Sequence, residues 1–346
     1  MMGERQPKAV ATTKAGRLLQ VTHLTKHYAV RGGVFGRTRG EVHAVDDVSF
    51  EIAEGETLGL VGESGCGKTT LGKTVLRLVE PTAGMIHWRG QRIDQLKGAA
   101  MRPYRRELQA VFQDPYASLN PRMRAADIVA EPIRNFEQAT AAQIEKRVLS
   151  LFEKVGLRAD QMAKYPYEFS GGQRQRLGIA RALAPQPRLI VCDEPVSALD
   201  VSVQAQVINL LVDLQREFGL SYLFVAHDLA VVEHISHRVA VMYLGRIVEV
   251  ASTRALFENP LHPYTEALLS AVPVPDPTAR RKRLILAGDV PSPIEVPTGC
   301  RFHTRCPYAF DRCKIEEPVL KKASPAHLVA CHLREVPITT ASIAHH

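Results

Sequence analysis

Apolar residues recur with different spacings along the chain, and each spacing predicts one kind of element. Within residues 18–60, apolar and polar positions alternate, with Val48 and Phe50 on one face, which predicts short strands with one buried side. Two continuous apolar runs, 189–192 and 223–226, predict strands buried on both faces, as in a parallel sheet. Segments with helical spacing separate these runs. The sequence therefore predicts an α/β fold, with a ligand at the carboxyl ends of the strands.

Composition divides the chain into further segments. A Gly- and Arg-rich run at 30–40 predicts a loop, and 115–170 is predicted to be mainly helical. Residues 271–299 hold six prolines, too many for regular structure, and predict a linker or an extended wrap. The last segment, 300–346, contains four of the six cysteines and is called the Cys-rich segment below.

Residues Gly62–Thr69 match the whole phosphate-binding pattern G-x-x-x-x-G-K-[ST]. The apolar run Thr57–Val61 precedes them, and Leu71 and Val75 follow at helical spacing, so the pattern lies between a predicted strand and a predicted helix. Its glycines let backbone N–H groups point at phosphate oxygens, and the helix N-terminus favours an anion. The sequence therefore predicts a nucleoside triphosphate site with contacts from Gly62, Glu63, Ser64, Gly65, Cys66, Gly67, Lys68, Thr69 and Thr70.

Side chains of this loop and of a later strand supply the expected chemistry. Lys68 is expected to reach the β- and γ-phosphates, and the Thr69 hydroxyl to bind Mg²⁺. The apolar run 189–192 ends in Asp193 and Glu194. We expect Asp193 to hold Mg²⁺, directly or through water, and Glu194 to orient the attacking water. Two solvated carboxylates at a strand end are the alternative, which the upstream phosphate loop disfavours.

A second motif, Ser170–Gln173, precedes a segment rich in good helix formers. Ser170 is predicted to cap this helix, with Gln173 completing a capping box. A generic capped helix does not need the two consecutive glycines, Gly171 and Gly172. Glycines there suit a close backbone approach to an anion at the helix N-terminus, which predicts a second phosphate contact.

Together these motifs resemble those of the ATP-binding subunits of ATP-binding-cassette (ABC) transporters. The resemblance covers about residues 18–270, after a basic tail at 1–17, and implies an ABC ATPase domain. That domain has a RecA-like parallel-sheet core, an antiparallel β subdomain and a helical subdomain at about 115–170. The resemblance further implies that Ser170–Gln173 is the signature motif, which contacts the γ-phosphate of ATP held by the opposite subunit of a head-to-tail dimer.

The resemblance also assigns roles to residues that are weak signals alone. It implies that Tyr28 stacks on adenine, that Gln113 senses Mg²⁺ and the membrane subunits, and that His227 bridges Glu194 and the γ-phosphate. The run that ends in Asp200 resembles the dimer-contact loop. The implied catalytic set is Glu194, His227, Lys68 and Gln113, and the implied Mg²⁺ set is Thr69, Gln113 and Asp193. The implied nucleotide contacts add Tyr28, Ser170, Gly171, Gly172, Gln173 and Asp200.

The runs Gln113–Arg122, Glu194–Gln204 and Asn259–Thr265 resemble the oligopeptide/dipeptide importer ATPases more closely. The Gly/Arg loop near Gly32 and the run Gly299–Phe302 with the later cysteines resemble the F-type subunit of dipeptide importers. This resemblance implies a homologous D-type ATPase partner, two transmembrane permease subunits and an extracytoplasmic solute-binding protein. Nickel and glutathione importers use similar ATPases, so the solute stays open. Soluble cassette proteins that act on ribosomes or DNA usually carry two cassettes or a coiled-coil insertion, and this chain has one phosphate loop.

Cys300, Cys306, Cys313 and Cys331 are separated by five, six and seventeen residues. Zinc sites favour closely paired cysteines, and four thiolates alone suit an iron–sulfur cluster, although this spacing is not a common ferredoxin run. Unligated thiols are the third alternative. The resemblance to dipeptide-importer tails, where a 4Fe-4S cluster is found, favours the cluster.

Charge and hydropathy bear on the partners and the location of the protein. The net charge of +8 is scattered and aromatic residues are 6% of the chain, without a base-stacking pattern, so we expect no nucleic acid partner. No apolar run approaches the ~18 residues of a membrane span, and the polar, basic N-terminus lacks the apolar block of a secretory signal. With the resemblance, this implies a peripheral protein on the cytoplasmic face of the inner membrane.

Overall fold

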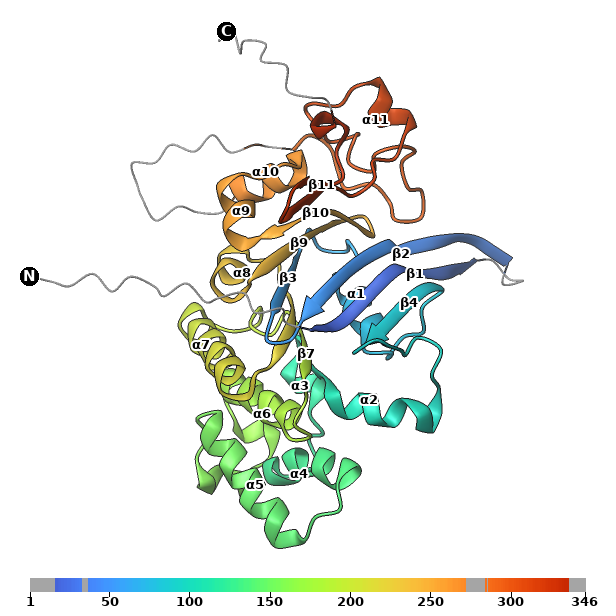
Figure 1. Cartoon of the computed structure of the whole chain (residues 1–346). Coiled ribbons are helices and arrows are strands. Elements are labelled where there is room, and N and C mark those ends of the chain that lie inside the picture. Colours follow the sequence, from blue (N-terminus) through green and yellow to red (C-terminus); the bar gives the residue numbers. More distant parts are fainter. Residues whose placement is uncertain (1–15, 33–36, 272–283, 285, 336–346) are drawn as a thin grey trace, which may run out of the picture.

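The computed structural model describes residues 16–32, 37–271, 284 and 286–335. Its centre is an eight-stranded sheet in which five neighbouring strands are parallel (Figure 1). In sheet order these are β9 (Arg238–Tyr243), β3 (Thr57–Val61), β8 (Ser221–Val225), β7 (Leu189–Asp193) and β6 (Leu108–Val111). Every residue of β3, β7 and β8 is buried, which confirms the prediction made from the continuous apolar runs.

The antiparallel sheet differs in detail from the prediction. It has the order β2 (Arg37–Ala53), β1 (Arg17–Gly32), β4 (Ala83–Trp88) and β5 (Gln91–Arg92). The prediction of short strands within 18–60 is wrong for β1 and β2, which are long because five register shifts let one hairpin bend without breaking. Most of the predicted loop at 30–40 therefore continues these strands, and residues 33–36 lie outside the described part.

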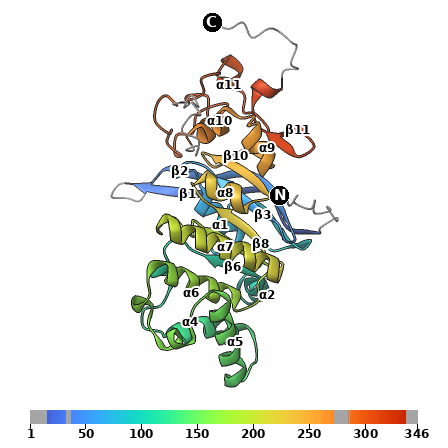
Figure 2. The same cartoon turned by 90° about the vertical axis from the view of Figure 1, so that its left-hand side faces the viewer.

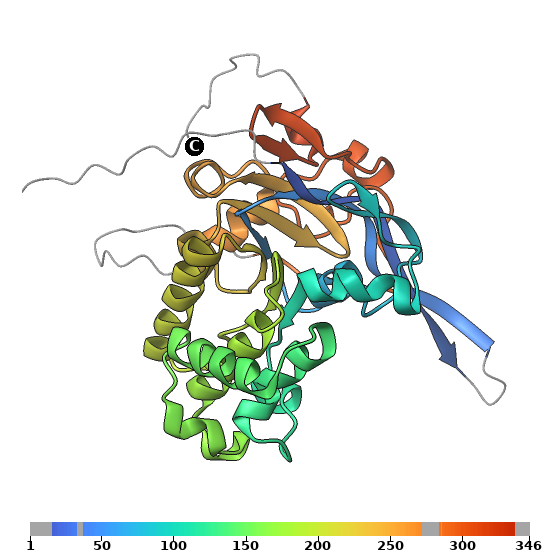
Figure 3. The same ribbon diagram turned by 60° about the horizontal axis from the view of Figure 1, so that its bottom comes forward.

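Helices cover the main sheet and form a separate group at one end of the molecule. Figures 1 and 3 show α4 and α5 gathered away from both sheets, and Figure 2 shows α7 and α8 lying across the main sheet. Helix α6 packs against α4 and α5 and also contacts β6 of the main sheet. The helices are α1 (Lys68–Val75), α2 (Arg102–Glu107), α3 (Pro115–Ser118), α4 (Ala125–Phe136), α5 (Ala141–Lys154), α6 (Gly171–Leu183), α7 (Val201–Phe218), α8 (Leu229–Ile235), α9 (Thr253–Glu258), α10 (Pro263–Ser270) and α11 (Asp311–Ile315). None of those in the described ranges has the length and apolar character needed to cross a bilayer.

The Cys-rich segment joins the main sheet. Its strand β12 (His327–Val329) pairs antiparallel with β10 (Arg246–Ser252), and β11 (Lys321–Ser324) pairs with β12. Of the predicted Pro-rich linker, residues 272–283 and 285 lie outside the described part, as do residues 1–15 of the N-terminal tail and 336–346 of the Cys-rich segment. Pro293 accepts a backbone hydrogen bond from His43 on β2. The Cys-rich segment therefore packs against the main sheet although the Pro-rich stretch lies between them in sequence, because distance along the chain does not prevent packing in space.

Candidate nucleotide site

The predicted phosphate loop connects β3 to α1 at the carboxyl end of the parallel sheet. Its glycines are required by close neighbours: a Cβ on Gly62 would lie 2.2 Å from the Met242 carbonyl oxygen, and a Cβ on Gly67 1.9 Å from that of Ala44. Gly67 also has φ of 109°, in the left-handed region that favours glycine. The loop is thus held between β2 and the end of β9.

Lys68, Thr69 and Asp193 meet at this loop. The Lys68 ammonium is buried and donates to the carbonyl oxygens of Gly62 at 2.7 Å and Glu63 at 3.0 Å. The Thr69 hydroxyl donates to a carboxylate oxygen of Asp193 at 2.9 Å. Burial raises the pKa of the Asp193 carboxyl, with Glu194 adding to the shift and Thr69 opposing it. A divalent cation here would reverse that shift, because its charge favours the carboxylate.

Glu194 lies between the two other residues that were expected beside it. Its carboxylate accepts a hydrogen bond of 3.0 Å from the Gln113 amide, and the same oxygen lies 3.5 Å from Nδ1 of His227. Glu194 has φ of 46°, a left-handed conformation that is rare for residues other than glycine, and such strained positions cluster at functional sites. Its backbone N–H donates to the Val225 carbonyl, which fixes the turn after β7.

Tyr28, Cys66 and Asp200, which were also predicted to contact the nucleotide, differ in exposure and in their neighbours. Tyr28 is 39% exposed on β1, with the Lys26 ammonium 4.8 Å from its ring centre, so one ring face is shared with a cation. The Cys66 side chain is buried, and burial raises the pKa of its thiol, so the backbone of this residue rather than its sulfur is available to a phosphate. Asp200 is the residue before α7, and its carbonyl accepts the first bonds of that helix.

The capping box at Ser170 is confirmed. The Ser170 hydroxyl accepts from the Gln173 N–H at 3.3 Å, and the Gln173 side chain accepts from the Ser170 N–H at 3.0 Å. A Cβ on Gly172 would lie 2.4 Å from a methyl group of Val203 on α7, so tight packing of two helices also requires this glycine. The motif stands at the start of α6, on the helical side of the molecule rather than at the chain's own phosphate loop (Figure 1).

Sequence reasoning missed two residues that contact the phosphate loop. The Tyr264 hydroxyl accepts from the Glu63 N–H at 2.7 Å, and the Arg305 guanidinium binds the Glu63 carboxylate through two hydrogen bonds of 2.7 and 3.1 Å. Tyr264 lies in the run Asn259–Thr265, which had served only as a point of family resemblance. Nothing in the local sequence around Arg305 points to the loop, which precedes it by more than two hundred residues.

Comparisons with known proteins agree with this geometry. A family model described as "ABC transporter" matches residues 45–197, and one described as "Oligopeptide/dipeptide transporter, C-terminal region" matches residues 248–313. A probable peptide ABC transporter ATP-binding protein of Sinorhizobium fredii is 54% identical over 327 residues, which are 94% of this chain and 92% of that protein. The chain belongs to the ABC transporter ATPases that carry the oligopeptide/dipeptide C-terminal region.

Further relatives and solved structures support the same family and fold. An oligopeptide transport ATP-binding protein of Bacillus subtilis is 53% identical over 319 residues, covering 91% of this chain and 97% of that protein. An ATP-binding cassette solved as a dimer with ADP and phosphate has a TM-score of 0.62 and 28% identity, covering 68% of this chain and 99% of that one. A cassette from Clostridium perfringens, part of an ABC transporter complex, has a TM-score of 0.61 and 26% identity, covering 70% and 92%.

In this ABC ATPase the four cysteines of the Cys-rich segment line one small cavity of about 20 Å³. All six cysteines of the chain are free, so no disulfide holds the segment together. Burial raises the pKa of the thiols of Cys300, to about 12, and of Cys306 and Cys331. These thiols therefore carry protons at neutral pH unless a metal displaces them. Besides the four cysteines, the cavity is lined by His262, His303, His332 and several apolar side chains.

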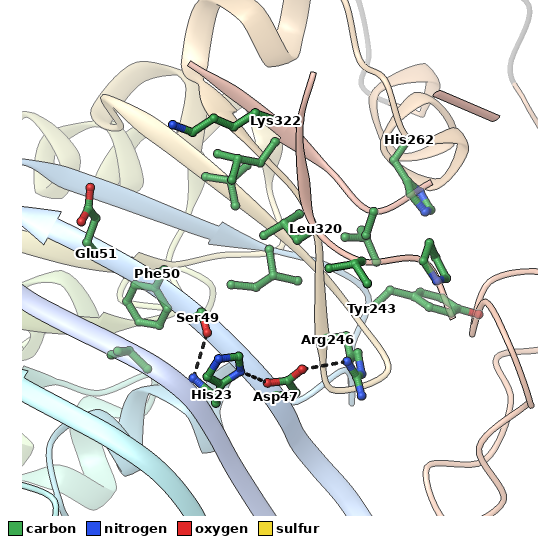
Figure 4. A pocket seen from close by; sticks show the side chains of 18 of the residues that line it. His23, Asp47, Ser49, Phe50, Glu51, Tyr243, Arg246, His262, Leu320 and Lys322 are labelled. Carbon is green, nitrogen blue, oxygen red and sulfur yellow. Dashed lines mark hydrogen bonds and ion pairs between the residues drawn. The ribbon is translucent and has the colours of Figure 1, made fainter. Parts of the chain in front are cut away.

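A larger cavity, of about 1070 Å³, lies between β1 and β2 on one side and β10 and β12 on the other (Figure 4). None of the predicted nucleotide contacts lines it. At one end, Asp47 pairs with His23 at 2.5 Å and with Arg246 at 3.3 Å. Residues of the Cys-rich segment, among them Arg301, Glu317 and Leu328, form part of its wall.

Among the described residues, one group of three side chains has the spacing of metal ligands, namely His27, His43 and Asp46. The guanidinium of Arg301 binds the Asp46 carboxylate directly, and that of Arg246 lies 3.6 Å from the same oxygen. Asp46 is the one carboxylate of this group, and the two guanidinium charges beside it would repel a metal ion. We therefore regard the group as part of the contact between β2 and the Cys-rich segment.

Proposed function

We propose that this ABC ATPase is the ATP-hydrolysing subunit of a peptide importer. The proposal rests on two groups of side chains that meet at the end of β7. In the first, Thr69 is hydrogen-bonded to Asp193. In the second, Glu194 lies between Gln113 and His227. In phosphate-loop enzymes a hydroxyl and a carboxylate hold Mg²⁺, and a separate group orients the attacking water. Peptide as the solute is supported by the match to the oligopeptide/dipeptide C-terminal region and by the similarity to peptide and oligopeptide transport ATP-binding proteins.

Each side chain has one task in the proposed reaction. Lys68 would exchange its carbonyl partners for the β- and γ-phosphate oxygens when ATP binds, and Thr69 and Asp193 would hold Mg²⁺. Bound between Thr69 and Asp193, Mg²⁺ would supply positive charge that offsets the charge developing on the transferred phosphoryl group. Glu194 orients a water for in-line attack, and Gln113 and His227 keep its carboxylate in place. Since the transition state is loose, this positioning supplies most of the rate enhancement.

The reaction needs a second cassette. We propose that Ser170–Gln173 contacts ATP held by a homologous D-type partner, and that Asp200 lies at the dimer contact. Two transmembrane permease subunits convert closure of the dimer into solute movement, and an extracytoplasmic binding protein delivers the solute. The chain then acts as a peripheral protein on the cytoplasmic face of the inner membrane.

The experiment that tests the solute is ATP hydrolysis by the assembled transporter in proteoliposomes, with binding protein added on the opposite side. We expect binding protein loaded with a dipeptide or an oligopeptide to stimulate hydrolysis, and nickel or glutathione to have no effect. Stimulation by nickel or glutathione alone would replace peptide as the solute and leave the ATPase mechanism intact. Hydrolysis by the chain alone, unaffected by the membrane subunits, would contradict the transporter role.

A substitution at the signature motif tests the dimer. In the assembled transporter, Ser170→Arg is expected to disable the ATP site built on the partner's phosphate loop, because a bulky cation would occupy the place of the γ-phosphate. The site built on Lys68 of this chain should still bind ATP, as measured with a photoreactive ATP analogue and subunit-resolved labelling. Loss of ATP binding at the chain's own loop in isolated subunits would contradict the head-to-tail arrangement.

We propose that the cysteine cavity holds a 4Fe-4S cluster through Cys300, Cys306, Cys313 and Cys331. All four cysteines line this one cavity, so the segment brings together residues that are separated by five, six and seventeen residues in sequence. Four thiolates are the usual ligand set of a four-iron cluster, in which each thiolate binds a different iron. Bound to the four thiolates, such a cluster would supply a covalent clip across the segment.

Anaerobically purified protein is therefore expected to be brown, with broad absorption near ~400 nm and about four irons per chain. Serine at any one of the four positions should lower the iron content. Serine at Cys66, which lies outside the cavity, should retain the full iron content and serves as the matched control. One equivalent of zinc without colour, or no metal at all, would contradict the cluster.

A further inference from the structure

The Cys-rich segment reaches the phosphate loop through one arginine. The Arg305 side chain is 8% exposed, and two of its nitrogens bind the two carboxylate oxygens of Glu63, at 2.7 and 3.1 Å. Glu63 is the second residue of the phosphate loop, directly after Gly62, and its side chain is 27% exposed. A bidentate arginine–carboxylate pair fixes the direction of the carboxylate as well as neutralising its charge.

The arginine itself is held by rigid surroundings. Its backbone N–H donates to the Phe302 carbonyl, and the Phe302 ring packs against Tyr243 and Tyr264 at centroid distances of 5.3 and 5.4 Å. The Tyr264 hydroxyl in turn accepts from the Glu63 N–H. Tyr264 therefore binds the backbone of Glu63, and Arg305 binds its side chain. Tyr264 packs against the Phe302 ring, and the Arg305 N–H donates to the Phe302 carbonyl.

A second set of ion pairs holds the same segment against β2. Arg301 binds the Asp46 carboxylate and donates to the Leu244 carbonyl. Arg246, near the labelled end of the large cavity in Figure 4, pairs with Asp47 at 3.3 Å and with Glu317 of the segment at 2.8 Å. The Cys-rich segment is therefore fixed to the cassette at residues that precede and follow Arg305 along the chain, Arg301 and Glu317.

We propose that Arg305 is a positioning residue of the ATP site, which sets ATP affinity by neutralising Glu63 and holding its carboxylate away from the bound triphosphate. Without the guanidinium, a partly buried negative charge on the phosphate loop would repel an anion whose own phosphates bind one residue away. The inference rests on the proposed nucleotide site, and it assigns part of that site to the Cys-rich segment. It gives this segment a function that does not depend on a metal.

The test uses charge-neutral replacements in the full-length chain. Arg305→Gln is expected to weaken ATP binding about tenfold and to raise KM by a similar factor, with kcat of the assembled transporter little changed. Adding Glu63→Gln to this variant should restore affinity to near the wild-type value, because the repelling charge is gone. Arg305→Lys should give an intermediate affinity, since lysine keeps the charge and loses the bidentate geometry.

Arg312→Gln is the matched control, because Arg312 also forms a two-bond pair within the segment, with Glu316, away from the loop. It should leave KM for ATP unchanged. The proposal is overturned if Arg305→Gln leaves affinity unchanged, or if the double variant binds as weakly as Arg305→Gln alone, which would indicate structural damage. If Arg305→Gln has no effect while Lys68→Ala abolishes binding, the nucleotide site stands and only this inference fails.

Discussion

Replacement of Glu194 by glutamine is expected to lower the rate of ATP hydrolysis at least about a hundredfold while leaving ATP binding intact. The amide retains an oxygen that can accept the 3.0 Å hydrogen bond from Gln113, so the side chain should stay in place. It loses the negative charge that orients and polarises the attacking water. Without turnover, the ATP-bound head-to-tail dimer should accumulate. Phosphate release and gel filtration with ATP measure the two effects.

Glu258→Gln provides the control for this substitution. Glu258 pairs with Arg254, four residues earlier on α9; both side chains are exposed, so the substitution should not affect hydrolysis. Hydrolysis by the Glu194→Gln transporter at a tenth or more of the wild-type rate would remove Glu194 from the proposed role. Loss of ATP binding would instead show that the substitution disturbs the turn after β7.

The phosphate loop and the capping box at Ser170 could be predicted, because each is formed by residues that are close together in sequence. The phosphate loop is a continuous run between a strand and a helix, and its glycines are required by backbone geometry that the pattern itself encodes. The capping box at Ser170 likewise involves residues three positions apart. The placing of Gln113 and His227 beside Glu194 needed the family resemblance, because the three residues come from separate segments of the chain.

The contacts of the Cys-rich segment were not predictable from local sequence. Arg305 lies 242 residues from Glu63, and Tyr264 lies 201 residues from it, so no periodicity or motif links them. The six prolines of the preceding stretch predict an absence of regular structure but say nothing about where the chain goes afterwards. Pairing of β12 with β10 depends on an edge that only the assembled sheet presents.

Lys68→Ala is expected to weaken ATP binding at least about a hundredfold. The ammonium group is buried and already bonded to two loop carbonyls, so it is held where the phosphates would bind. Alanine removes the only charge of the loop that complements the β- and γ-phosphates, and it also frees the two carbonyl oxygens to point at the anion. ADP, which lacks the γ-phosphate, should lose less affinity than ATP. Equilibrium binding of both nucleotides to the full-length chain measures the difference.

Lys97→Ala serves as the control, because Lys97 is exposed and lies 3.9 Å from Glu80, away from the loop. It should leave both affinities unchanged. A melting temperature for Lys68→Ala close to that of the wild type would show that weaker binding does not come from unfolding. Unchanged ATP affinity in Lys68→Ala would contradict the assignment of the loop as the triphosphate site, since no other side chain of Gly62–Thr70 carries a positive charge.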